Sequence, residues 1–143
     1  MIENIFHNEI LMAVIIRSNF RQEGITFFTP EDFSQQLGYM NRPKGYKIPP
    51  HIHRHLERKV FFTQEVLVVK SGKVRVDFYN EEQDYLESRI IARGDVILLA
   101  AAGHGFEFLE DAELIEIKQG PYSSTDDKIR FTNSAHSTAT VEK

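Results

Sequence analysis

The stretch "TQEVLVVKSGKVRVDFY", residues 63–79, decides the fold class. Two β-branched runs meet at Gly72, and in the second run Val74, Val76 and Phe78 alternate with polar residues. Successive side chains of a strand point to opposite faces, so this alternation predicts a strand with one buried face. Similar short runs, broken by Gly, Asp or Asn, occur at residues 10–16, 60–69, 88–92, 95–101, 105–110 and 112–119. This spacing predicts an all-β sandwich or barrel rather than a parallel α/β sheet.

The composition is that of one globular domain of 143 residues, 41% hydrophobic and 27% charged. Lys and Arg total 17, Asp and Glu total 21, and the basic residues are scattered, so we expect no nucleic-acid partner. The absence of cysteine excludes disulfides and thiolate metal ligands, and it fits a cytoplasmic protein. The apolar residues 10–16 are too few to span a bilayer, so we expect a buried strand there and no membrane partner.

One short helix is expected before the main run of strands. In "TPEDFSQQLGY", residues 29–39, Thr29 suits the N-cap, Pro30 the first helical position and Gly38 the stop. The predicted single domain, residues 1–143, divides into three regions. An N-terminal strand and this helix (residues 1–44) pack on a barrel core (residues 45–119), and residues 132–143, rich in Ser and Thr, form a mobile tail.

Histidines occupy every second position of "HIHRH", residues 51–55. On a strand, His51 and His53 would present two imidazoles on one side, close enough to bind one metal ion. Pro49 and Pro50 cannot donate to a sheet ladder, so a strand that begins here would lie at a rim, where ligand sites occur. A row of solvated histidines is the alternative interpretation.

Two glutamates compete to complete this site. Glu57 shares the parity of the histidines, but four residues of strand place it about 13 Å from His53, beyond one coordination sphere. Glu65 lies in an apolar strand, where an unpaired carboxylate is unfavourable to bury. If the polar run 54–59 is the tip of a hairpin, Glu65 returns opposite His51 or His53. We favour Glu65 and keep Glu57 as the alternative.

His104 is the fourth candidate ligand. It shares parity with Phe106 and Phe108, so we expect it on an inward apolar face. It is either a core histidine bonded to the backbone or a residue of the site. Lys118, in the last strand, either reaches the mouth of the barrel or is solvated.

Two linked motifs in these residues resemble those of the cupin superfamily. The first is Gly45-x5-His51-x-His53 with Glu65-x6-Gly72, and the second is Gly94-Asp95-x8-His104. The resemblance implies a small jelly-roll barrel in which His51, His53, Glu65 and His104 bind one divalent metal ion, which would be Fe, Mn, Ni, Co or Zn. Residues 63–79, 94–111 and 115–122 also resemble small bacterial single-domain cupins that are commonly found near genes for surface polysaccharide.

The resemblance leads us to expect a metal-binding cupin that binds or modifies a small polar molecule such as a sugar or sugar derivative. A metal-dependent oxygenase or isomerase would suit such a site. The first alternative is a metal-free protein like the sugar-nucleotide isomerases and epimerases of the same fold, with a histidine base. The second is a non-catalytic domain that binds or senses a ligand. We also expect a homodimer, formed by sheet edges or by strand exchange.

Overall fold

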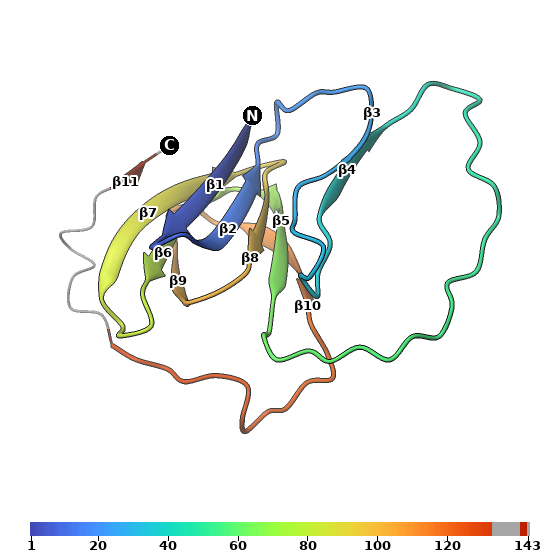
Figure 1. Ribbon diagram of the computed structural model, residues 1–143. Coiled ribbons are helices and arrows are strands. Elements are labelled where there is room, and N and C mark those ends of the chain that lie inside the picture. The colour runs from blue at the N-terminus through green and yellow to red at the C-terminus, as the bar shows by residue number, and fades with distance from the viewer. Residues whose placement is uncertain (133–140, 143) are drawn as a thin grey trace.

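The computed structural model describes residues 1–132, 141 and 142, and in these residues the chain forms β-strands and no helix (Figure 1). The strands are β1 (Ile2–His7), β2 (Ile10–Ile16), β3 (Gly24–Phe27), β4 (Gly38–Asn41), β5 (Glu65–Ser71), β6 (Lys73–Tyr79), β7 (Tyr85–Ala92), β8 (Val96–Leu99), β9 (Gly103–Phe108), β10 (Glu113–Lys118) and β11 (Val141–Glu142). No described helix has the length and apolar character needed to cross a membrane. Most of the predicted tail, residues 133–140 and 143, lies outside the described residues.

Two larger sheets enclose the core. A five-stranded sheet has the order β1-β2-β8-β5-β10, and a four-stranded sheet has the order β11-β7-β6-β9. All neighbours pair antiparallel except β11 and β7. Apolar side chains from both sheets meet between them, among them Ile5, Leu67, Val76, Ile91 and Ile97. The all-β prediction is therefore confirmed, although the two sheets do not close into a barrel, since β1, β9 and β10 each have one unpaired edge in the described residues.

The stretch that decided the fold class forms β5 and β6, and it takes the chain from one sheet to the other. Gly72 lies between these strands with a φ of 82°, in the left-handed region that favours glycine. A Cβ there would collide with the carbonyl oxygen of Asp111. In β6, Val74, Val76 and Phe78 lie in the core, as the alternation predicted. The other face of β6 carries Arg75 and Asp77, which are also buried. They satisfy each other, since Arg75 Nε donates to Asp77 Oδ1 at 2.8 Å.

The helix predicted over residues 29–38 is wrong. This segment is an irregular turn in which the Leu37 amide donates to Thr29 Oγ1, and the Gln36 side chain donates to backbone carbonyls within the turn. Phe28, Phe33 and Leu37 pack on Val14, Val66 and Leu98, on the face of the five-stranded sheet opposite the main core. A helix of about two turns has little stability of its own. The burial of these three side chains and the hydrogen bonds of the Thr29 and Gln36 side chains therefore determine the conformation of the segment. Gly38, the expected stop, begins β4 instead.

The hairpin predicted to join His51 to Glu65 is also wrong. Residues 42–64 contain no strand, and they run as a long excursion between β4 and β5 (Figure 1). Glu65 already pairs with Leu99 of β8 on one side and with Lys118 of β10 on the other. Because both edges of β5 are occupied, no third strand can add to it.

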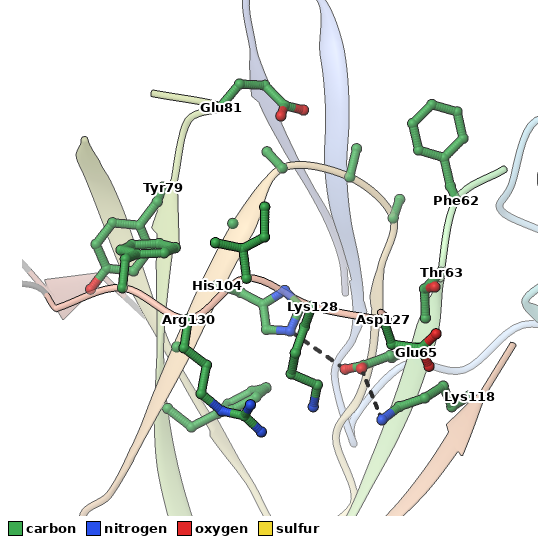
Figure 2. A pocket seen from close by; sticks show the side chains of 18 of the residues that line it. Phe62, Thr63, Glu65, Tyr79, Glu81, His104, Lys118, Asp127, Lys128 and Arg130 are labelled. Carbon is green, nitrogen blue, oxygen red and sulfur yellow. Dashed lines mark ion pairs between the residues drawn. The ribbon is translucent and has the colours of Figure 1, made fainter. Parts of the chain in front are cut away.

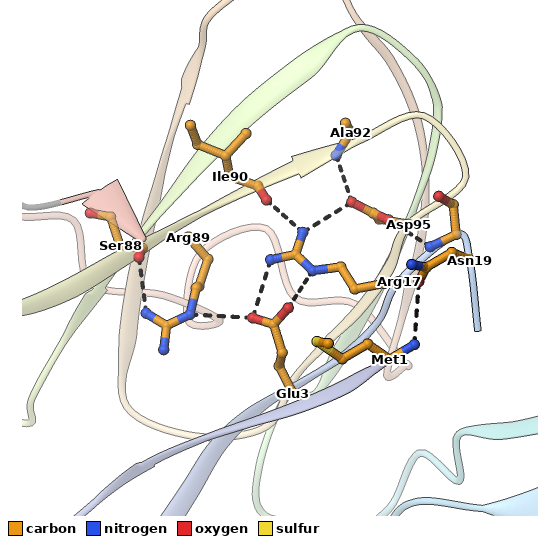
Figure 3. Close-up of polar contacts among 10 residues, drawn as sticks. Met1, Glu3, Arg17, Asn19, Ser88, Arg89, Ile90, Ala92 and Asp95 are labelled. Atoms are coloured by element: carbon orange, nitrogen blue, oxygen red, sulfur yellow. Dashed lines mark hydrogen bonds and ion pairs between the residues drawn. The ribbon is translucent and has the colours of Figure 1, made fainter. Parts of the chain in front are cut away.

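A buried polar network joins β1, β2 and the turn before β8 (Figure 3). Arg17 donates to Glu3, to Asp95 Oδ2 at 3.1 Å and to the carbonyl of Ile90 at 2.7 Å. The Arg17 hydrogen bond holds the pKa of Glu3 below its ordinary value, although partial burial opposes this shift. Burial acts to lower the pKa of Arg17, but Glu3 and Asp95 outweigh it and the pKa is raised. Arg17 is therefore a permanent cation that ties the ends of three segments together.

We predict that Arg17→Met lowers the free energy of unfolding by about 2–4 kcal/mol, because it leaves buried Asp95 without its cation and Glu3 with Arg89 alone. Lys73→Met is the matched control, since it removes an ion pair with Glu110 whose side chains are 55% and 53% exposed. That variant should change stability by less than about 0.5 kcal/mol. Urea denaturation of both variants measures the difference, and equally small losses would contradict a structural role for the network.

Candidate functional site

A pocket with a volume of about 750 Å³ opens where the ends of the two sheets meet. Its walls come from the start of β5, the chain from the end of β8 into β9, the end of β10, and residues 127–131. Figure 2 shows Glu65 at the centre of this pocket, between His104 and Lys118. These three side chains come from three strands of two different sheets.

Glu65 is the first residue of β5 and shares the inward face with Leu67 and Val69 of the core. It is only 8% exposed, and its carboxylate contacts the His104 imidazole and the Lys118 ammonium group. The hydrogen bond with His104 holds the pKa of Glu65 below its ordinary value, burial opposes this, and the charge of Lys118 adds to the lowering. The Glu65 carboxylate is therefore ionised in the neutral pH range.

His104 lies on β9, opposite Phe78 of β6, and faces the same interior. Its Nε2 is 3.4 Å from Glu65 Oε2, and its ring is tilted against that of Phe106 with centroids 5.5 Å apart. The side chain is 27% exposed, so one edge of the imidazole is accessible from the pocket. A histidine held by a carboxylate in this way is the arrangement that general acid–base catalysis uses.

Lys118 is the third residue of the central cluster, which consists of Glu65, His104 and Lys118. The register of β10 and β5 sets it opposite Glu65, and its Nζ is 3.5 Å from Glu65 Oε1 and 3.6 Å from Glu116 Oε2. Burial acts to lower the pKa of Lys118, but the charges of Glu65 and Glu116 outweigh it and the pKa is raised. Of the two orientations that the sequence left open for Lys118, the structure has the one that reaches the pocket.

Other residues of the pocket had no clear signal in the sequence. Phe131 packs edge-on against Tyr79 with ring centroids 5.1 Å apart, and this contact anchors residues 127–131 over the pocket. Lys128 and Arg130 project from this segment and line the same pocket as His104, and they form no ion pair with another described residue (Figure 2). Tertiary contacts, among them that of Phe131, bring these cations to the site, so spacing along the chain could not reveal them.

The predicted ligands His51 and His53 lie elsewhere. Both are exposed in the excursion between β4 and β5, with ring centroids 5.2 Å apart, and neither lines the pocket. His51 Nδ1 is 3.0 Å from the carbonyl oxygen of Pro49. The alternative carboxylate, Glu57, is exposed in the same segment. The structure thus brings Glu65 and His104 together and leaves His51 and His53 apart from them.

The central cluster does not by itself form a metal site. Among the described residues, no group of three or more His, Cys, Asp or Glu side chains is placed to hold a metal ion. Glu65 and His104 offer two donors, and the third neighbour, Lys118, is a cation that would repel a metal. As arranged, the cluster is suited to proton transfer and to binding a polar ligand.

Comparisons of the chain with protein-family models, with curated proteins and with solved structures found no significant match.

Proposed function

We propose that the pocket binds a small polar molecule, and that His104 with Glu65 transfers protons to and from it. The observation that carries this proposal is the contact between His104 Nε2 and Glu65 Oε2 at the bottom of an open pocket. The Glu65 carboxylate contacts His104 Nε2, and the exposed edge of the imidazole is available to a ligand. A proton can then be taken up and returned at one position.

The charges around this pair indicate which molecules fit. Lys128 and Arg130 are not paired with other described residues, and they offer donors to a carboxylate or phosphate. Glu81 and Glu116 line the same pocket and can accept hydrogen bonds from hydroxyl groups. A sugar or sugar derivative that carries an acidic group has both kinds of partner.

We also propose that the fold is a small jelly roll of the cupin type. Two facing sheets that are antiparallel apart from β11, with a pocket where their ends meet, are what a small jelly roll of the cupin type would have. The metal-free isomerases of that fold are the functional class that the His104 and Glu65 pair resembles. The homodimer and the cytoplasmic location stay predictions.

We predict that His104→Gln abolishes proton exchange while ligand binding persists. The assay first screens sugar phosphates and hexuronic acids for an increase in melting temperature, and then follows incorporation of solvent deuterium into the bound compounds by NMR. Loss of exchange by about 100-fold or more is expected without the proton-transferring group. His55→Gln is the control, because His55 is exposed and does not line the pocket. Stabilisation without exchange in the wild type would support a non-catalytic binding domain instead.

The lowered pKa of Glu65 gives a separate prediction for stability against pH. A carboxyl group whose pKa is lowered on folding contributes stability above its ordinary value of 4.5 and loses it as the pH falls through the lowered value. The difference in unfolding free energy between wild type and Glu65→Gln should therefore change in favour of the variant as the pH falls below about 4.5. Urea denaturation at several pH values tests this, and a pH-independent difference would contradict it.

Metal binding is the second candidate function. Two of the four predicted ligands already converge, and His51 and His53 lie side by side in a segment that forms no strand. If this segment folds over the pocket, the purified protein should contain about one divalent ion per chain, by elemental analysis. His51→Gln/His53→Gln and His104→Gln should each lose that ion. Equal metal content in the wild type and both variants would exclude this site.

A further inference from the structure

A second hollow of about 830 Å³ lies next to the pocket, at the end of the β1–β2 hairpin. Its walls are largely apolar, and they include Phe6, Ile10, Leu11, Phe27, Phe28 and Phe33. The charged residues among those that line it, Glu9, Asp32 and Lys59, are all exposed to solvent. The buried polar group is Gln64, whose side-chain oxygen accepts bonds from the Gln35 amide and the Ser34 hydroxyl. The hollow is therefore suited to a hydrocarbon or aromatic group.

The two cavities share a wall. Phe61, Phe62, Ala100 and Ala101 line both the pocket around Glu65 and the apolar hollow. The boundary consists of the chain at Ala100 and Ala101, just after β8, and of the exposed rings of Phe61 and Phe62. A molecule that occupies both cavities would lie against these two rings.

Large apolar side chains remain uncovered around this second hollow. Phe61 is 87% exposed, Phe62 66%, Phe27 56% and Ile10 52%. A cluster of exposed apolar side chains beside a polar site is typical of a surface that a ligand covers. Burial of these rings on binding would supply affinity that the polar cluster, which already satisfies its own charges, does not.

We propose that the ligand of this protein is amphipathic: its polar part lies against His104 and Lys118 in the pocket around Glu65, and its apolar part lies in the hollow beside Ile10 and Phe27. The inference rests on the proposed function for the polar end. It adds that the ligand class is a small polar molecule, such as an acidic sugar, that bears an alkyl or aromatic substituent. The adjacency of the two cavities and their shared lining favour this occupant over a separate partner.

The test compares methyl, butyl and octyl β-D-glucuronides, each below the concentration at which it forms micelles. The dissociation constant for wild-type protein should fall by about 30-fold or more from methyl to octyl, because each buried methylene adds affinity. Ile10→Asn should reduce this ratio to about fivefold or less. Ile115→Asn is the matched control, since Ile115 is 49% exposed on a strand and lines neither cavity. It should leave the ratio unchanged.

NMR distinguishes failure of this inference from failure of the proposed function. The His104 imidazole should shift with all three compounds, and the methyl groups of Ile10 and Leu11 should shift only with the longer chains. A His104 response without any effect of chain length would overturn the amphipathic ligand and leave the proposed function standing. Methyl shifts without a His104 response would overturn both. A dimer dissociated by Ile10→Asn would assign the hollow to a second copy of the chain and also overturn the inference.

Discussion

Both edges of β5 are occupied, by β8 and β10, and this places the Glu65 carboxylate within a sheet with only 8% of the residue exposed. An ionised carboxylate in that position needs cationic or protonatable partners. One of them, Lys118, comes from the adjacent strand of the same sheet, and the other, His104, comes from the opposite sheet. The pocket therefore forms where the two sheets meet. Because the buried Glu65 carboxylate needs partners from both sheets, the packing of the sheets determines which side chains surround it.

Much of the fold was readable from local pattern. The strand of residues 73–79 and the strand of residues 10–16 were predicted with their observed bounds, because alternation and continuous β-branched runs are signals carried by neighbouring residues. The same parity argument set His104 with Phe106 and Phe108 on an inward face; Phe106 packs against the core, whereas Phe108, at the end of β9, is 58% exposed. The helix over residues 29–38 failed for a physical reason: capping signals are local, but the burial of Phe28, Phe33 and Leu37 depends on a sheet that comes from elsewhere in the chain.

The site was only half readable for the same reason. Parity tells which face a side chain occupies but not which strand lies beside it, so the pairing of Glu65 with Lys118 rather than with the histidine segment was not visible. The alternation in β10 did contain a signal for Lys118. Leu114, Glu116 and Lys118 share one face of the strand, so the two charged side chains that follow core residue Leu114 indicate that this face leaves the core towards the end of β10. Lys128 and Arg130 had no such signal, because tertiary contacts such as that of Phe131 with Tyr79 bring them to the pocket.

β8 spans only four residues, from Val96 to Leu99, and its two ends have different surroundings. Asp95, just before it, is fixed by Arg17 and by the amides of Ser18 and Ala92, whereas Ala100 and Ala101, just after it, line both cavities. The polar network and the cavity walls therefore lie at opposite ends of one short central strand. A substitution at Ala100 or Ala101 would change the shape of both cavities and leave the contacts of Arg17 with Asp95 in place.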